Sequence, residues 1–212
     1  MPATKQKLPK PPPRPYHHGD LRNALIQAGL EILAEGGTQA LGFRDVARRA
    51  GVSSAAPYRH FPGKAGLLAA IAEEGFHKML QLEEIAIASF TDDPLQQLRA
   101  KCAVYIQFSL DNPQHIRVMF GGILAHPEAP NSLHHAANKL FSLLVNKVQA
   151  CQSAGVFCPG NAEQQAMTIW SVLHGLTMIL LDSNRLPVQE IPRDPIAMTN
   201  WILAPLLTGL LV

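Results

Sequence analysis

The stretch FRDVARRAGVSSAAPYRHF, residues 43–61, decides how the whole chain is interpreted. Its first part has apolar residues at the i, i+3, i+4 and i+7 spacing of one helical face, which predicts a short amphipathic helix. These residues are Phe43, Val46, Ala47 and Ala50. Gly51 follows, where the end of a helix needs a residue that tolerates positive φ. Two short helices joined by a turn that contains glycine form the outline of a helix-turn-helix, which inserts its second helix into the major groove of DNA.

Pro57 constrains where that second helix begins. Proline in a helix interior removes a hydrogen bond and clashes with the carbonyl four residues back, whereas the first turn tolerates it. We therefore predict that Ser54 caps the helix, or that the first turn is open if Ser53 is the cap. In both cases the second helix is only about two turns long.

The residues that follow resemble a known family. The motif YRHF at 58–61 is followed by Gly63-Lys64 and Leu67-Leu68, and this pattern resembles the end of the DNA-binding domain of TetR-type transcriptional regulators. The segment YHHGDLR at 16–22 resembles the start of the first helix in one branch of that family. Trp170-Ser171 with His174-Gly175 resembles a ligand-domain signature of the same branch.

The resemblance implies individual roles at the DNA. Tyr58 and His60 are expected to contact phosphates from the recognition helix, and Lys64 from the start of the next helix. Lys64 also suits an anion on physical grounds, because its charge adds to the free N–H groups of a helix N-terminus. The base-facing positions of the family pattern hold small residues, namely Ser53, Ser54, Ala55 and Ala56. Direct readout should therefore be sparse, with Arg44, Arg59 and DNA shape contributing more of the specificity.

Charge is distributed unevenly along the chain. Residues 1–66 contain ten Lys or Arg against four Asp or Glu, a net charge of +6, whereas residues 67–212 contain eight against twelve, a net charge of −4. We therefore expect only the first part to meet a polyanion. Arg48 and Arg49 are expected on a solvated helix face. Residues 1–15 are basic and rich in proline, which predicts a disordered arm that either reaches phosphates and the minor groove or serves as a solubilising tail.

Helical patterns fill the rest of the chain. Helices are predicted at residues 20–35, 64–87, 94–112, 114–120, 132–154, 162–181 and 196–212, in addition to the two in the opening stretch. Pro205 should kink the last of them. The predicted fold class is all-α, with a three-helix DNA-binding domain of the helix-turn-helix type at residues 16–66 and a larger helical ligand-binding and dimerisation domain at 67–212.

By resemblance, the larger domain should hold a small-molecule pocket. The candidate lining residues are Tyr105, Phe108, Met119, Phe120, Phe141, Trp170, His174 and Met178. Trp170, His174 and Met178 recur every four residues and so share a helical face, and His174 is the best polar anchor. An ordinary packed core is the alternative for each of them. Because Arg117 is the one basic residue that we expect to be buried in this region, a neutral or weakly polar ligand is favoured.

The segments 162–181 and 196–212 lack a polar stripe. A helix that is apolar all round must be covered on every side, so we predict that both pack against the same pair from a second copy. Trp201, Ala204 and Leu207 are placed at this homodimer interface. The strongly apolar runs 166–181 and 196–212 are each shorter than the roughly 20 residues of a membrane span, so no membrane contact is expected.

An enzyme is the main rival class. The sequence contains no Gly-rich phosphate loop, metal-ligand pair or nucleophile elbow, so neither catalytic residues, nor a metal site, nor a cofactor is predicted. Three cysteines without metal-type spacing and a start unlike a signal peptide favour a cytoplasmic protein. The predicted function is a ligand-responsive repressor that binds a palindromic double-stranded DNA operator as a homodimer and is released by a small-molecule effector. The alternatives are an activator, a ligand-independent DNA-binding protein, and a helical enzyme or scaffold.

Overall fold

The computed structural model describes residues 18–182 and 191–209. Its elements there are helices joined by short loops: α1 His18–Ala40, α2 Phe43–Arg49, α3 Ala56–His60, α4 Gly63–Ile87, α5 Pro94–Asp111, α6 Pro113–Met119, the 3-10 turn η1 Ile123–Ala125, α7 Asn131–Ser153, α8 Ala162–Asp182 and α9 Pro195–Thr208. The all-α prediction is confirmed. The predicted N-terminal arm and the end of the last predicted helix lie outside the described residues.

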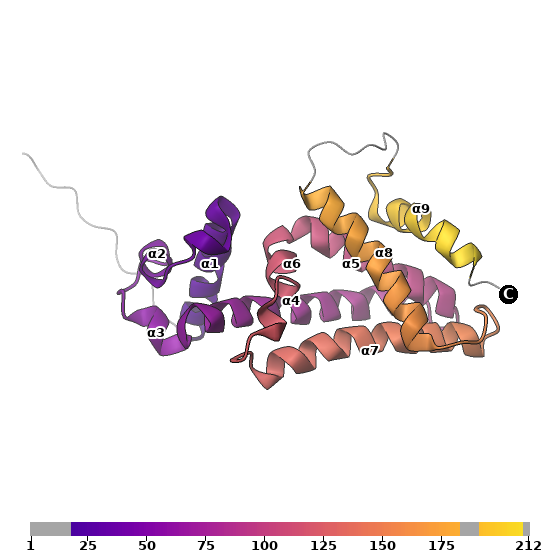
Figure 1. Ribbon diagram of the computed structural model, residues 1–212, viewed down its shortest axis with the longest axis horizontal. Coiled ribbons are helices and arrows are strands. Elements are labelled where there is room, and N and C mark those ends of the chain that lie inside the picture. The colour runs from indigo at the N-terminus through magenta and orange to yellow at the C-terminus, as the bar shows by residue number, and fades with distance from the viewer. Residues whose placement is uncertain (1–17, 183–190, 210–212) are drawn as a thin grey trace, which may run out of the picture.

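The long helix α4 organises the molecule (Figure 1). Its start packs against α1 at the end that contains α1–α3, and the rest of it packs against α5, α6 and α7. Helix α8 packs against α5 and α7, and α9 packs against α5 and α8. The predicted domain boundary between residues 66 and 67 therefore falls inside a continuous helix.

Gly51 ends helix α2, as the sequence predicts. Gly51 has φ +69°, and the N–H groups of Gly51 and Val52 donate to the carbonyls of Arg48 and Ala47 at 3.3 and 2.9 Å. These two bonds form a Schellman motif, which requires a residue of positive φ directly after the helix. Gly37 acts in a similar way, because its φ of 63° breaks the regular helix inside α1, where the sequence predicts an end at Gly36-Gly37.

The recognition helix differs from the prediction in its cap and its length. It has 5 residues, which is shorter than the predicted two turns. α3 begins at Ala56, and its N-cap is Ala55, with no side-chain cap hydrogen bond, so neither Ser53 nor Ser54 caps it. The chain instead forms a turn in which the Ala56 N–H donates to the Ser53 carbonyl at 2.9 Å. Pro57 lies in the first turn, as predicted, because only there is its missing N–H without consequence.

The helices of the larger domain follow the sequence closely. α4 to α8 begin and end within one residue of their predicted bounds. Three polar side chains cap helices: Asp93, Asn161 and Asp194 accept hydrogen bonds from backbone N–H groups three residues on, at 2.9, 3.0 and 2.8 Å. Pro205 lies inside α9.

Candidate functional site

Three of the four small residues predicted to face bases lie on the surface. Ser53, Ser54 and Ala55 are exposed in the turn before α3. Ala56 is buried, because the first turn of α3 directs it, together with Pro57, towards the core of the small domain. Ala56 is therefore not available to a base.

The other predicted DNA contacts surround this turn. Tyr58 is 64% exposed, and its ring packs edge-on against Phe43 with a centroid distance of 4.9 Å. Arg59 is exposed and His60 is half-buried. The Lys64 ammonium donates to the Thr38 carbonyl, which holds the charge close to the first turn of α4.

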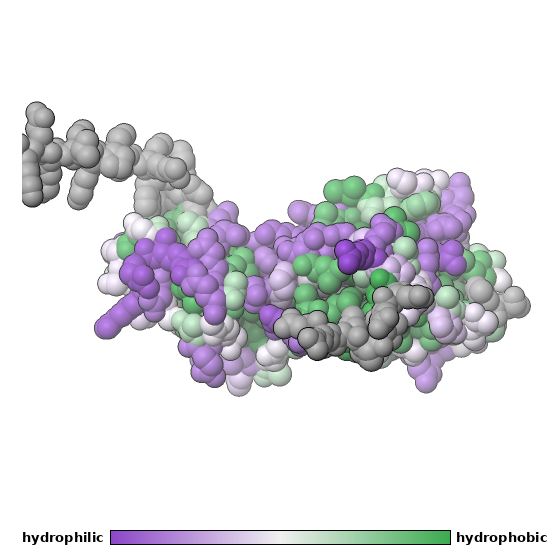
Figure 2. Space-filling view, turned by 90° about the horizontal axis from the view of Figure 1, so that it is seen from above, coloured by the Kyte–Doolittle hydropathy of each residue, from purple (hydrophilic) through white to green (hydrophobic). Residues whose placement is uncertain are grey.

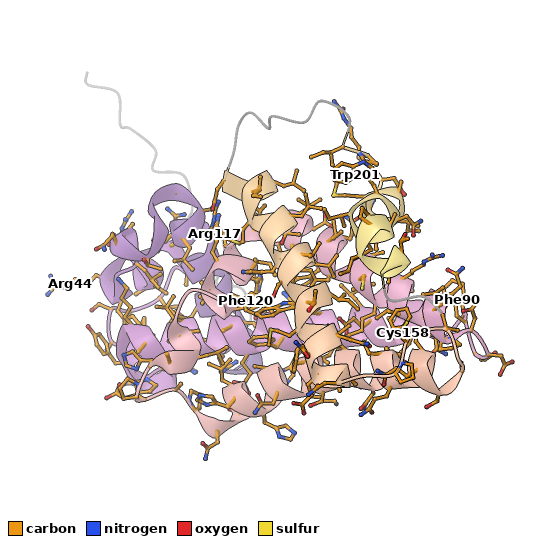
Figure 3. All side chains as sticks on the ribbon, turned by 45° about the vertical axis from the view of Figure 1, so that its right-hand side comes forward. Arg44, Phe90, Arg117, Phe120, Cys158 and Trp201 are labelled. Atoms are coloured by element: carbon orange, nitrogen blue, oxygen red, sulfur yellow. The ribbon has the colours of Figure 1, made fainter. Side chains whose placement is uncertain are left out.

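The arginines of α2 fall into two groups. Arg44 lies at the end of the molecule far from the larger domain, and its side chain points into solvent (Figure 3). Arg48 pairs with Asp45 at 2.6 Å, and Arg49 forms a two-pronged pair with Glu35 at 2.7 and 2.6 Å. These bonds from Arg49 lower the pKa of the Glu35 carboxyl. Arg48 and Arg49 thus occupy the solvated face that the sequence predicts.

Arg22 is a basic residue of this region for which the sequence predicts no role. It is exposed on α1, and its guanidinium carbon lies 5.5 Å from the centroid of the Phe61 ring. That distance is within the range of a cation–π contact, which orients the side chain without neutralising its charge. The signal in the sequence was only its place in the YHHGDLR motif.

The larger domain contains a cavity of about 230 Å³. Its walls come from α4, α5, α7 and α8, together with Phe120, which follows α6 and lies among these helices (Figure 3). Four of the predicted pocket residues line it, namely Tyr105, Phe120, Phe141 and Trp170. The space is far larger than the roughly 10–15 Å³ that one water needs, so it is large enough for an organic molecule.

His174 lies directly behind this wall. Its Nδ1 is 2.7 Å from the Tyr105 hydroxyl, and its ring stacks on Trp170 with a centroid distance of 5.4 Å. Burial lowers the pKa of His174, which favours the neutral ring. Burial also raises the pKa of Tyr105, so this residue keeps its hydroxyl proton. His174 therefore fixes two lining residues and is itself set back from the cavity.

Three predicted pocket residues lie elsewhere. Phe108 is buried and faces the His115 ring at a centroid distance of 6.2 Å. Met119 is buried beside Gly75, where an added Cβ would lie 2.5 Å from the methionine sulfur. Met178 packs against the core two helical turns beyond Trp170, past the end of the cavity. These three residues belong to the core.

The cavity wall also contains a buried ion pair that the sequence reading missed. Lys101 of α5 and Glu83 of α4 are 5% and 3% exposed, and the lysine ammonium donates to Oε2 of the carboxylate. Arg117, which we expected to be buried, is instead exposed and pairs with Asp182 at 2.6 Å. The expectation of a neutral ligand rested on Arg117 being the one buried basic residue, and that premise is wrong.

A pattern in the sequence could have revealed this pair. Lys101 falls three residues after Leu98 and four before Tyr105, so it shares their apolar helical face. Glu83 falls seven residues after Phe76 and four after Met79, so it also shares an apolar helical face. A charged residue within an apolar stripe on each of two helices is a sign of a buried pair.

The proposed dimer residues divide between surface and core. Trp201 is 40% exposed on the outer side of α9 (Figure 3), and Ala204 is exposed beside it. Leu207 is buried within the protomer, because six residues turn a helix through about 600° and so bring it to the inner face. Other large apolar side chains exposed on or near α8 and α9 are Met167, Ile179 and Ile196. Figure 2 shows hydrophobic residues gathered on the larger domain, whereas the α1–α3 end is mostly hydrophilic.

Two classes of site do not occur in the part of the chain that the structure describes. No group of three or more His, Cys, Asp or Glu residues there is placed to hold a metal ion. No helix there is both long enough and apolar enough to cross a membrane.

Comparison with known proteins gives two family matches. Residues 25–71 match the tetR family of bacterial regulatory proteins, and residues 98–205 match the tetracyclin repressor-like C-terminal domain. The chain is also similar to the HTH-type transcriptional activator FasR of Mycolicibacterium smegmatis, with 30% identity over 99 residues. That alignment covers 47% of this chain and 45% of the relative, so it spans less than half of the relative's length.

Solved structures share the whole architecture. A protein of unknown function from Rhodococcus sp. RHA1 is 27% identical, with a TM-score of 0.77, and the match covers 94% of this chain and 100% of that one. The TetR family regulator PfmR from Thermus thermophilus is 20% identical, with a TM-score of 0.68 and coverage of 85% and 97%. Together with the helix-turn-helix described above, the family matches show that this chain belongs to the tetR family of bacterial regulatory proteins, and that it is a DNA-binding transcriptional regulator and not an enzyme.

Proposed function

We propose that this regulator represses transcription by binding a palindromic operator as a homodimer, and that a small molecule in the cavity releases it. The main support is the position of α6. This helix packs against α1 of the DNA-binding end and against α4, and the residue that follows it, Phe120, lines the cavity. A ligand that displaces Phe120 would move α6 against α1 and so change the orientation of the recognition helix.

The proposed DNA surface is the set of exposed and half-buried residues around the turn before α3. It comprises Arg44, Ser53, Ser54, Ala55, Tyr58, Arg59, His60 and Lys64, with Arg22 as an added phosphate contact. Two such surfaces must meet half-sites roughly 34–36 Å apart. A shift of a few ångströms between them would therefore weaken the contacts of one half-site, and with them the avidity of the dimer.

The proposed dimer interface is the outer face of α8 and α9. Support comes from the exposed apolar side chains on or near these helices, including Trp201, Met167 and Ile179. Covering such a face by the same face of a second copy gives an isologous contact. Ala204 lies on this face, and Leu207 is left out of it. We place the DNA-binding domain at residues 16–66, the larger domain at 67–212, and the site of action in the cytoplasm.

Activation instead of repression is the second candidate. Its support is the similarity to FasR, which is named as an activator. A reporter gene under the control of the operator separates the two: deletion of the regulator should raise expression if it represses, and should lower expression if it activates.

Fluorescence anisotropy with labelled DNA from upstream of the regulator's own gene tests the binding function. Specific binding should lie in the range of about 10⁻⁸–10⁻¹¹ M at physiological salt, and at least about 10³-fold tighter than binding to shuffled DNA. Arg44→Ala should weaken binding, whereas Arg48→Ala, on the same helix but paired with Asp45, should change it little. Equal affinity of the wild-type protein for upstream and shuffled DNA would contradict the proposal.

A further inference from the structure

The Glu83–Lys101 pair closes one end of the ligand cavity. Both side chains line the cavity, one from α4 and one from α5, and both are almost fully shielded from solvent. A buried ion pair adds little stability, because well-packed apolar residues of similar volume serve as well or better. Its presence in the wall of a cavity therefore points to a role in binding.

The rest of the cavity is suited to an apolar body. Phe76, Phe120, Phe141 and Trp170 contribute aromatic surface. The other polar side chains of the lining are those of Tyr105, whose hydroxyl is already engaged by His174 at 2.7 Å, and Asn138, which carries no charge. A polar group of a ligand therefore finds its strongest partners at the charged end, where Glu83 and Lys101 lie.

The charges around the pair favour an anionic head group. A second cleft lies on the other side of the pair, and Glu83 and Lys101 line this cleft as well. Its other charged residues are Glu84 of α4 and Lys139 and Lys147 of α7. Lys101, Lys139 and Lys147 therefore outnumber Glu83 and Glu84 when the two spaces that share the pair are taken together. An ammonium group placed here would meet an excess of positive charge, whereas a carboxylate would be attracted.

We propose that the cavity binds an apolar molecule that ends in a carboxylate, and that this carboxylate replaces Glu83 as the partner of Lys101. This inference names the ligand class for the proposed function and rests on it. Glu83, once displaced, takes a proton from solvent and remains as a neutral carboxylic acid, while Lys101 keeps its charge. Burial raises the pKa of Glu83 to about 7, so the protonation costs little near neutral pH.

The exchange also links the ligand to α4. Glu83 lies on the same helix whose start carries Lys64 and packs against α1. Release of the bond between Glu83 and Lys101 removes one of the direct ties between α4 and α5. Ligand binding therefore acts on the helix that joins the cavity to the DNA-binding end.

Isothermal titration calorimetry with three matched probes tests the proposal: decanoic acid, decan-1-ol and decylamine, each added to the full-length wild-type protein at pH 7.5. Decanoate should bind at least about ten-fold more tightly than decanol, because a charge-assisted hydrogen bond replaces a neutral one. Decylamine should bind most weakly.

Two variants sharpen the test. Glu83→Gln leaves Lys101 without a competing carboxylate and should tighten decanoate binding. The double variant Glu83→Gln with Lys101→Met has no unpaired buried charge, so it keeps the proposal testable even if a single variant folds poorly. In the double variant the affinity for decanoate should exceed that for decanol by no more than about two-fold.

Equal binding of the three probes by the wild type, or decanoate preference retained in the double variant, would overturn the inference while leaving a ligand-responsive regulator intact. Binding of none of the probes would also overturn the inference, whereas the ligand-release part of the proposed function does not depend on this ligand class. Operator binding without ligand is measured separately by anisotropy, so failure of the DNA-binding part is distinguishable from either result.

Discussion

Replacing Glu83 with glutamine should change how the stability of the protein depends on pH. A carboxyl whose pKa is higher in the folded chain than in the unfolded chain keeps its proton longer in the folded state. The folded state then loses stability as pH rises from the unfolded pKa to the folded pKa. For Glu83 this interval runs from 4.5 to about 7, because burial outweighs the attraction of Lys101.

The magnitude follows from the width of that interval. Each pKa unit corresponds to 1.36 kcal/mol, so the wild type should lose about 3 kcal/mol of unfolding free energy between pH 4.5 and 7 through this group. Glutamine does not titrate, so the Glu83→Gln variant does not undergo this decrease in unfolding free energy. The pKa of Glu74 is lowered to about 2 by His115 and Lys78, so Glu74 changes the unfolding free energy only at pH values below 4.5. That effect is the same in the wild type and the variant, so it cancels from their difference.

Urea unfolding followed by circular dichroism, at one protein concentration and at pH 4.5, 5.5, 6.5 and 7.5, measures the effect. The variant should gain about 3 kcal/mol over the wild type between the lowest and highest pH. Glu84→Gln, at the exposed neighbouring position, should show a difference from wild type that stays within about 0.5 kcal/mol. A difference between Glu83→Gln and wild type that is independent of pH, or that favours the wild type as pH rises, would refute the reasoning.

Three further predictions concern the DNA surface, the dimer and the cavity. Lys64→Ala should reduce the slope of log affinity for the operator against log salt concentration by about 1.8 per dimer, since two phosphate contacts are lost. An unchanged slope in anisotropy titrations would exclude a phosphate contact by Lys64. Trp201→Asp should give a folded or partly folded monomer by light scattering, because an unpaired charge is costly in a desolvated interface; a dimer with full operator affinity would place the interface elsewhere. Trp170→Ala should retain operator binding but lose the thermal stabilisation that cavity ligands give the wild type, and retained stabilisation would argue against a binding role for this wall.

Local features of the fold were predictable because they depend on neighbours in sequence. Gly51 marks the end of α2 through its positive φ, and Asp93 marks the start of α5 through its cap bond. Pro57 lies in the first turn of α3, as its missing N–H requires. The identity of the α3 cap was not predictable, since the chain satisfies the Ala56 N–H through a backbone turn to Ser53 and not through a side chain.

The cavity depended on packing between helices that are distant in sequence. The four-residue spacing of Trp170, His174 and Met178 correctly places them on one face of α8. The packing of α5 and α7 decides where the cavity ends along that face. Of these three residues, Trp170 lines the cavity, and His174 contacts the lining residue Tyr105. Burial of Lys101 likewise depends on its meeting Glu83 of another helix.

Selection of double-stranded DNA from a random pool by the purified full-length protein tests most directly whether this regulator reads an operator as a dimer. We expect an enriched inverted repeat whose half-site centres are about 10–10.5 base pairs, or a multiple of that, apart. Native mass spectrometry of the selected DNA should then find an even number of chains on it. Failure to enrich any sequence, or enrichment of an asymmetric site that binds a single chain, would contradict dimeric operator recognition.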